Sequence, residues 1–404
     1  MSEKKKTERW CKPRHKFIKG AVSLILSPIN RFKFGLRPQK FKEQGKRNYL
    51  IIANHQTSFD QFFVGQIFKG PVYYVTTEDL FSNGFVSKLI KFLVEPIPIK
   101  KQSTDMRAVM NCIKVAKEGG SICIFPEGNR TYSGTTEYFN PAIVKLAKFI
   151  NLPIAFVRIE GGYGVEPRWG RNTRKGKSTC YVSKVMEPEE YKNLPNEELF
   201  DVIKKNIYVD DRTNGGTFKS RHLAEYLERA VYVCPDCGLS TFISKKDKVT
   251  CLKCGKTAQY HPDLTLTGVD CDFPFKSVKE WYDYQTDFIN KLDVTTLTDQ
   301  PVYTDTSRFS EVRLYKNKKR ILKNATVCLY GDRITVSGKD KEFEFKFDDL
   351  SVVTVLGRNK LNVYHKDKVY QFKPHPRFNS LKFVHFYYRY KNIKEGNNDG
   401  YLGI

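Results

Sequence analysis

Two short apolar runs that each end in a cluster of polar residues constrain the fold of this chain more than any other feature. Residues 49–53 (Tyr-Leu-Ile-Ile-Ala) lead directly into 54–60 (Asn-His-Gln-Thr-Ser-Phe-Asp). Residues 121–124 (Ser-Ile-Cys-Ile) lead in the same way into 125–131 (Phe-Pro-Glu-Gly-Asn-Arg-Thr). Both runs have the length of buried strands rather than helices. Because ligand and catalytic groups of α/β folds gather at strand ends, we expect the two clusters to serve one site.

The first cluster holds a His and an Asp that can act as a pair. A helix is predicted to begin at Thr57 or Ser58, since Ser58 and Gln61 have the spacing of a capping box. His55 then lies in the strand-to-helix turn and Asp60 in the first helical turn, so the imidazole can fold back onto the carboxylate. A carboxylate that holds Nδ1–H fixes the tautomer and leaves Nε2 free to accept a proton.

Each cluster also has a purely structural explanation. A His near an Asp is commonly structural or solvated, and residues 125–131 can form a Pro-Gly turn after a strand. The occurrence of both clusters in this order, each at the end of an apolar run, disfavours the structural explanation.

On these residues the chain resembles the lysophospholipid acyltransferase family, whose best-known members are the 1-acylglycerol-3-phosphate acyltransferases. His55 and Asp60 match the family's motif of a His and an Asp separated by four residues. The phosphate-site motif is matched by Phe125, Pro126, Glu127, Gly128 and Arg130. Both motifs are specific, and the resemblance covers about residues 48–230.

Two further blocks of the family are matched more weakly. Residues 95–101 hold Glu95 and Lys101 at positions where the family carries Gly and Arg. Lys keeps the positive charge but loses bidentate recognition of phosphate, so the headgroup is less defined. Residues 152–157, an apolar strand entered through a Pro, resemble the fourth block.

The resemblance implies an α/β fold with an αβα acyltransferase core and a direct transfer without a covalent enzyme intermediate. His55 would deprotonate the free hydroxyl of a lysophospholipid, which attacks an acyl thioester on coenzyme A or acyl carrier protein. Asp60 would orient His55. The acceptor is expected to be 1-acylglycerol 3-phosphate, giving phosphatidic acid, with another lysolipid or glycerol 3-phosphate as alternatives.

The resemblance also implies how the acceptor is held. Arg130, with Lys101 and Lys100, would bind the phosphate. Glu127 and Gly128 would shape the acceptor site, since a Gly allows close approach of the backbone. This chemistry needs no catalytic cofactor.

The charge of the chain points to an anionic surface as a partner. The net charge is +25, and many of the basic residues lie in the first fifty positions. They bracket the apolar run 21–26, which Ser27 and Pro28 end and which is far shorter than the ~20 residues of a membrane span. No cleavable signal peptide is expected, because the run lacks a small-residue cleavage site. We therefore expect a cytoplasmic protein, peripheral or monotopic on the cytoplasmic face of a membrane.

Two Cys-x-x-Cys pairs predict a second, separate element. Cys234 and Cys237 are followed after thirteen residues by Cys251 and Cys254, and a Gly follows each pair. This spacing is typical of a zinc ribbon with four thiolate ligands. Two disulfides or a redox pair are the alternatives, and a cytosolic setting argues against disulfides. Four thiolates fill the tetrahedral shell, so we expect structural zinc that does not touch substrate.

The remaining segments are predicted from their periodicity. Residues 218–231 and 276–292 are expected to be helices, and the basic loop 168–177, which carries a Trp, is expected to be solvated or to hold phosphate. Short strands with turn residues between them are predicted at 311–315, 325–330, 333–337, 342–346, 351–356, 360–364 and 368–372. With a closing aromatic-rich helix at 379–391, this pattern resembles a pleckstrin-homology-like β domain.

The chain is accordingly expected to have five segments. They are a basic membrane-facing segment (1–47), an acyltransferase domain (48–230), a zinc ribbon (231–260), a helical linker (261–309) and a pleckstrin-homology-like domain (310–404).

A different class of function stays open at this point. A zinc ribbon in a strongly basic chain is also typical of nucleic-acid-binding proteins. That function leaves the polar clusters at the two strand ends without a role, and the ribbon's linking loop is poor in aromatic residues. Nucleic acid is therefore not the expected partner.

Overall fold

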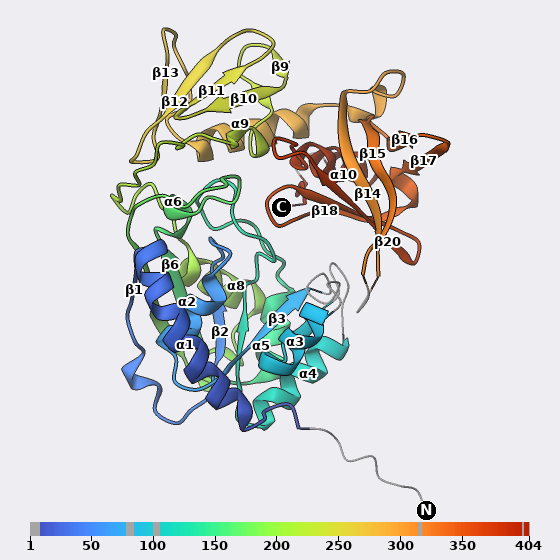
Figure 1. Ribbon diagram of the computed structural model, residues 1–404. Coiled ribbons are helices and arrows are strands. Elements are labelled where there is room, and N and C mark those ends of the chain that lie inside the picture. The colour runs from blue at the N-terminus through green and yellow to red at the C-terminus, as the bar shows by residue number, and fades with distance from the viewer. Residues whose placement is uncertain (1–8, 78–84, 100–105, 314–316, 398–399, 404) are drawn as a thin grey trace, which may run out of the picture.

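The computed structural model describes residues 9–77, 85–99, 106–313, 317–397 and 400–403. Figure 1 shows the N-terminal α/β part, in blue and green, with two β-rich parts, in yellow and red, packed along one end of it. Lys100 and Lys101, expected to help bind phosphate, lie outside the described residues.

The N-terminal part has the expected α/β fold and is built on a mixed sheet. Within the described residues the sheet has seven strands in the order β1-β7-β6-β2-β5-β3-β4. Its strands are β1 (Leu36–Pro38), β2 (Leu50–Ala53), β3 (Val72–Thr77), β4 (Ile97–Ile99), β5 (Ser121–Ile124), β6 (Ile154–Glu160) and β7 (Ser178–Met186). Neighbouring strands are parallel except β6 and β7, which are antiparallel. The two apolar runs therefore lie side by side as β2 and β5, both fully buried.

Helices cover both faces of this sheet. They are α1 (Arg14–Lys33), α2 (Asp60–Ile67), α3 (Phe85–Val94), α4 (Met106–Lys117), α5 (Ala142–Ile150), α6 (Gly162–Val165), α7 (Pro188–Tyr191) and α8 (Asn196–Ile207), with a 3-10 turn η1 (Lys42–Gln44). Because side chains alternate along a strand, Ile51 and Ala53 of β2 pack in one core with α2. Leu50 and Ile52 point the other way and pack with α4, α5 and α8. The expected αβα layering follows from this alternation.

The apolar run 21–26 lies within a longer helix. Although Ser27 and Pro28 end the run, α1 continues through Pro28 to Lys33. A Pro removes one helical hydrogen bond, which here frees the carbonyl of the exposed residue Leu24. None of the described helices is long and apolar enough to cross a membrane.

The predicted helix at 218–231 is wrong. The segment is a series of turns with one short 3-10 helix, η3 (Leu227–Arg229), and Tyr226 has a positive φ of 74°. Two of its backbone N–H groups donate to the neighbouring hairpin instead of to a carbonyl one helical turn earlier. Ala224 donates to the carbonyl of Lys246, and Tyr226 donates to Oγ of Ser244. The apolar spacing reflects packing of an irregular segment.

The cysteine-bearing part consists of two small antiparallel sheets and a helix. The strands are β8 (Val233–Cys234), β9 (Gly238–Leu239), β10 (Phe242–Lys245), β11 (Lys248–Cys251), β12 (Thr257–Tyr260) and β13 (Leu266–Gly268). The expected helix follows as α9 (Val278–Lys291), with Ser277 as its N-cap accepting from the N–H of Glu280. A short η4 (Val294–Thr296) leads onward.

The C-terminal part is an antiparallel β domain closed by a helix, as expected. Within the described residues its sheet has seven strands in the order β17-β16-β15-β14-β20-β19-β18. They are β14 (Tyr303–Val312), β15 (Lys319–Leu329), β16 (Arg333–Gly338), β17 (Lys341–Lys346), β18 (Leu350–Leu356), β19 (Lys360–His365) and β20 (Lys368–Pro374), with η5 (Phe347–Asp349) and the closing helix α10 (Leu381–Lys394). The first strand, β14, begins at Tyr303, well before the predicted position 311. The sequence did not reveal this start, because polar and apolar residues alternate less clearly in this strand.

Candidate active site

The His and Asp of the first motif are in direct contact. His55 lies in the turn between β2 and α2, and its Nδ1 is 2.8 Å from Oδ2 of Asp60. The side chain of Asp60 is fully buried, whereas that of His55 is 20% exposed. The imidazole also stacks on the ring of Phe125, with 4.5 Å between centroids. With Nδ1–H donated to Asp60, Nε2 of His55 is free to accept a proton.

Asp60 is held by more than the imidazole. Its Oδ2 accepts the backbone N–H groups of Gln56 at 2.6 Å and Thr57 at 2.9 Å, and its Oδ1 accepts Thr57 Oγ1–H at 2.6 Å. Asp60 is also the first residue of α2, where a negative charge is favoured by the helix dipole. These donors compensate a buried carboxylate and fix its orientation toward His55.

The predicted capping box at Ser58 and Gln61 is wrong. The helix begins two residues after Ser58, and the Ser58 hydroxyl donates to Oε2 of Glu166 at 2.7 Å. The loop that precedes α2 is therefore organised by the carboxylates of Asp60 and Glu166.

Glu127 of the second motif supports the backbone around His55. Its Oε1 accepts the N–H of His55 at 2.7 Å, and its Oε2 accepts the N–H of Glu137 at 2.8 Å. Burial raises the pKa of Glu127 well above its ordinary value, although these two donors oppose the rise. Gly128 follows with a φ of +64°, a conformation that favours Gly. Glu127 thus joins the ends of β2 and β5.

Arg130 is a buried cation with an unused donor. Its Nη1 is 3.5 Å from Oε2 of Glu166 and has no hydrogen-bond partner among the described residues. Burial lowers the pKa of Arg130 to about 10, and Glu166 opposes this shift, so the guanidinium keeps its charge at neutral pH. A buried donor without a partner marks a place where an anion can bind.

Several residues of this region were missed by the sequence reasoning. Glu166 also accepts the N–H of Ser58 at 2.9 Å, and Asp211 accepts from Gln56 Nε2 and from the N–H of Gly161. Burial raises the pKa of Asp211 to about 6 against these donors. Glu166 caps the short helix α6, which follows β6, so its place shortly after a strand was the one signal that could have found it.

The basic loop 168–177 is not solvated as a whole. Arg168 and Trp169 are fully buried. Arg168 donates to the carbonyl of Arg130 at 2.9 Å and lies over the ring of Tyr132. The guanidinium of Arg168 therefore holds the backbone of the second motif and does not face solvent.

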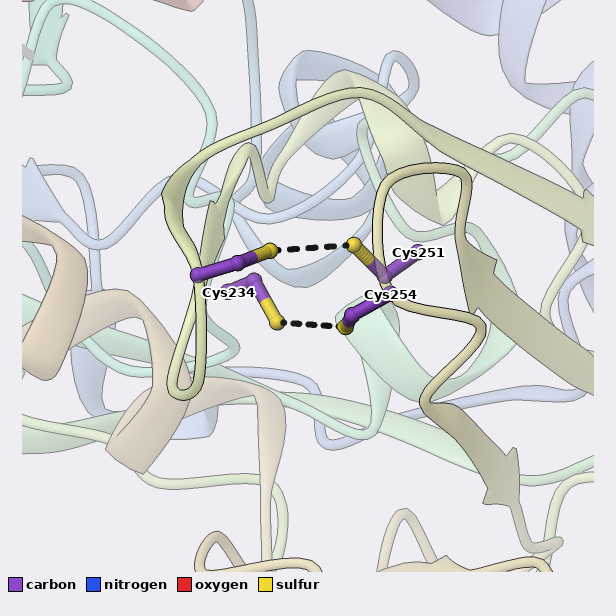
Figure 2. A group of neighbouring side chains, drawn as sticks. Cys234, Cys251 and Cys254 are labelled. Carbon is purple, nitrogen blue, oxygen red and sulfur yellow. Dashed lines mark hydrogen bonds between the residues drawn. The ribbon is translucent and has the colours of Figure 1, made fainter.

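The four predicted metal ligands converge. Their Sγ atoms lie within 4.8 Å of one another, with 3.5 Å between Cys234 and Cys254 and 3.6 Å between Cys237 and Cys251. Figure 2 shows Cys234 facing Cys254, with Cys251 beside Cys254. These distances are too long for disulfides, whose S–S bond is about 2.05 Å. They are close to the edge of about 3.8 Å of a tetrahedron with Zn–S bonds of about 2.3 Å. The donor set therefore fits zinc.

Three comparisons with known proteins found similarity to acyltransferases. Residues 36–160 match the family model described as Acyltransferase. A 1-acyl-sn-glycerol-3-phosphate acyltransferase of Bacillus subtilis is 23% identical over 186 residues, which are 46% of this chain and 88% of that protein. One of Borreliella burgdorferi with the same name is 31% identical over 25% of this chain and 41% of its own length. The crystal structure of the 1-acyl-sn-glycerophosphate acyltransferase PlsC of Thermotoga maritima aligns with a TM-score of 0.41 and 19% identity, covering 48% of this chain and 79% of that one.

The mixed α/β core and the matched domain define an O-acyltransferase. Over this domain the chain is similar to the 1-acyl-sn-glycerol-3-phosphate acyltransferases, which are members of the lysophospholipid acyltransferase family. The matched residues 36–160 leave the whole C-terminal half of the chain outside the match.

Proposed function

We propose that this protein transfers a fatty acyl group from an acyl thioester to the free hydroxyl of 1-acylglycerol 3-phosphate, forming phosphatidic acid. The observation that carries the proposal is the 2.8 Å contact between His55 and the buried Asp60 at the end of β2. The relatives named 1-acyl-sn-glycerol-3-phosphate acyltransferase support this acceptor.

The proposed reaction is a single displacement at the thioester carbonyl. The acceptor hydroxyl forms the new C–O bond while its proton passes to Nε2 of His55. The C–S bond then breaks, and the thiolate of coenzyme A or of acyl carrier protein takes up that proton. Asp60 stabilises the imidazolium that exists between these transfers.

The acceptor phosphate is assigned to Arg130. This guanidinium is charged and buried, and its Nη1 is a donor without a hydrogen-bond partner within the described residues. Glu127 and Gly128 act by shaping the loop that presents it. Lys100 and Lys101, which lie outside the described residues, stay in the proposal as further cations for the phosphate.

A membrane surface is proposed as the source of the acceptor. Exposed apolar side chains gather on three neighbouring helices, namely Phe17, Leu24, Ile25 and Phe32 of α1, Phe85 and Phe92 of α3, and Met106 and Met110 of α4. α1 lies against α3, where Arg14 donates to the carbonyl of Phe92. An apolar face with basic residues beside it fits insertion among anionic headgroups at the cytoplasmic face of a membrane.

Vesicle binding tests this surface and also the nucleic-acid alternative. The protein is mixed at one salt concentration with anionic vesicles, zwitterionic vesicles or duplex DNA. We expect binding to anionic vesicles, weakened by Phe17→Ser with Phe32→Ser and unchanged by Phe149→Ser, an exposed Phe on α5. Tight DNA binding without preference for lipid would favour the nucleic-acid function.

The four cysteines are proposed to hold one structural zinc ion. Cys234, Cys237, Cys251 and Cys254 would be its ligands, and the ion would tie β8 and β9 to the β10–β11 hairpin. Four thiolates leave no position for substrate, so the contribution is to stability.

An acceptor panel tests the proposed reaction. Purified protein is given labelled oleoyl-coenzyme A or an oleoyl acyl carrier protein with 1-acylglycerol 3-phosphate, glycerol 3-phosphate or lysophosphatidylcholine. We expect labelled phosphatidic acid from the first acceptor at the highest rate. A higher rate with either other acceptor would replace the proposed substrate, and no product from any combination would reject the proposed function.

A further inference from the structure

A turn of the C-terminal β domain reaches the second motif of the acyltransferase domain. The turn joins β18 to β19 and carries Arg358, whose Nη2 is 3.3 Å from Oε1 of Glu166. The other oxygen of this carboxylate, Oε2, faces Arg130 at 3.5 Å. One buried carboxylate therefore stands between two guanidinium groups that come from different parts of the chain.

The position of this turn does not depend on the side chain of Arg358. Arg168 donates from Nε to the carbonyl of Gly357 at 3.0 Å and from Nη2 to that of Val355 at 3.2 Å. The hydroxyl of Tyr132 donates to the carbonyl of Arg358 at 3.3 Å. These contacts all involve backbone atoms of the turn, so the turn is docked by its main chain.

The turn is also fixed from the side of its own domain. Asn359 donates from Nδ2 to the carbonyls of His375 and Pro376, and its own carbonyl accepts the hydroxyl of Ser380. Gly357 has a φ of +65°, which allows the tight turn. A turn that is held on both sides presents the Arg358 side chain at a defined place.

The charges around Glu166 leave an excess of positive charge. Arg130 and Arg358 share this one carboxylate, and the buried Arg168 adds a further guanidinium that bonds to carbonyls. Nη1 of Arg130 still lacks a hydrogen-bond partner among the described residues. The side chain of Arg358 is 37% exposed, so a ligand can reach it. Two guanidinium groups, one of them with a buried N–H that lacks a hydrogen-bond partner, can bind a phosphomonoester.

We propose that Arg358 binds the phosphate of the acyl acceptor together with Arg130, so that the C-terminal β domain supplies part of the active site. The proposal rests on the proposed acyl transfer to a phosphorylated lysolipid. The proposal assigns to the β domain a role in acceptor specificity. Arg358 would also provide a second guanidinium for the phosphate, in a chain that carries Lys101 where the family has Arg.

Acceptor kinetics of the full-length protein test this assignment. The KM and kcat of wild type, Arg358→Ala and Arg358→Lys are measured with 1-acylglycerol 3-phosphate and with 1-acylglycerol, which lacks the phosphate. The matched control is Arg320→Ala, an exposed arginine on β15 of the same domain. The KM for the acyl thioester is measured in parallel, because coenzyme A also carries phosphate.

We expect Arg358→Ala to lower kcat/KM for the phosphorylated acceptor about tenfold or more, as for loss of one charged hydrogen bond. The unphosphorylated acceptor and the thioester should be affected less than twofold. Arg358→Lys should restore part of the loss, and Arg320→Ala should equal wild type. An equal loss for both acceptors, an unchanged kcat/KM, or an effect confined to the thioester would overturn the assignment.

A binding measurement separates this proposal from the proposed reaction. Calorimetric titration with glycerol 3-phosphate needs no turnover, and it is done on wild type, Arg358→Ala and Arg320→Ala after thermal unfolding has shown that each is folded. We expect weaker binding in Arg358→Ala alone. If wild type transfers no acyl group, the proposed reaction fails, and equal binding by all three proteins would separately overturn the role of Arg358.

If Arg358→Ala does not fold, Arg358→Lys replaces it in the kinetic and the binding measurement. Wild-type kcat/KM and wild-type affinity in Arg358→Lys would then overturn the role of Arg358.

Discussion

The carboxylate of Glu127 holds the backbone of His55, with Oε1 accepting the His55 N–H at 2.7 Å. The same turn is bound again on its other side, where Thr131 donates its N–H to the carbonyl of His55 at 3.0 Å. Two residues of the second motif thus fix the main chain of the proposed base. The two motifs are separate in sequence and act as one structural unit.

Replacing Glu127 should therefore impair the position of His55. Glu127→Ala leaves the buried N–H groups of His55 and Glu137 without acceptors, each costing about 1–3 kcal/mol. We expect kcat to fall at least about tenfold and the unfolding midpoint in urea to fall as well. Glu127→Gln keeps one acceptor oxygen and should lie between wild type and Glu127→Ala. Unchanged kcat in Glu127→Ala, measured by acyl transfer, would show that His55 needs no such support.

Asp60→Asn tests the orienting charge. The variant keeps the size of the side chain but cannot stabilise the imidazolium of His55, and a comparable change in a catalytic triad costs about 10⁴-fold in kcat. We expect a loss on the order of 10²- to 10⁴-fold, smaller than that caused by removing His55. Asp201→Asn, on the exposed face of α8, is the control and should keep wild-type turnover. Equal activity of the two variants would remove Asp60 from the proposed mechanism.

Removal of zinc should destabilise the cysteine-bearing part without blocking the chemistry directly. Chelation is expected to release about one zinc per chain and to lower the midpoint of thermal unfolding, because metal binding contributes to folding. Cys254→Ser should reproduce the effect, whereas Cys271→Ser, an exposed cysteine outside the cluster, should bind zinc like wild type. Hydrogen exchange should rise first around 234–254. An apo protein with unchanged unfolding would exclude a structural zinc.

The buried Lys382 should make the free energy of unfolding depend on pH. This residue of α10 is buried over the ring of Tyr303, and burial lowers its pKa to about 7 although Asp305 opposes the shift. In the unfolded chain the pKa is about 10.4. Between these values the unfolded state binds the proton and the folded state does not, so this group makes stability rise as pH rises from about 7 to about 10.

Lys382→Met removes that contribution. Relative to the variant, wild type should gain up to about 1.4 kcal/mol in the free energy of unfolding per pH unit above pH 7. The measurement is urea unfolding of both proteins at pH 7.5 and 9.5, with Lys394→Met, an exposed lysine at the end of the same helix, as control. A difference between wild type and Lys382→Met that stays constant with pH would contradict this account.

Regular elements could be predicted where one local pattern determined them. β2 and β5 are short, fully buried strands, and their apolar runs predicted both almost to the residue. α9 and the later strands of the β domain followed from amphipathic spacing and turn residues in the same way. The juxtaposition of the two motifs also followed, because strand ends meet at one edge of a parallel pair.

Other features depend on contacts between segments that are distant in sequence. The helix expected at 218–231 is absent, and the N–H groups of Ala224 and Tyr226 donate to the β10–β11 hairpin instead. The basic residue Arg168 is buried because carbonyls of the motif and of the β18–β19 turn accept its donors. Glu166 and Arg358 belong to no motif, and only the docking of the β domain brings them together. The clustering of the four cysteines could be predicted from their spacing alone, because each Cys-x-x-Cys turn brings two thiols together.

Acyl transfer by a His55 variant shows whether His55 is the base of the reaction. Labelled oleoyl-coenzyme A and 1-acylglycerol 3-phosphate are given to wild type, to His55→Ala and to His222→Ala, an exposed histidine paired with Glu225. Circular dichroism and thermal unfolding confirm that all three are folded. We expect labelled phosphatidic acid from wild type and His222→Ala and a loss of at least about 10³-fold in His55→Ala. Near-wild-type turnover by a folded His55→Ala protein would contradict the account.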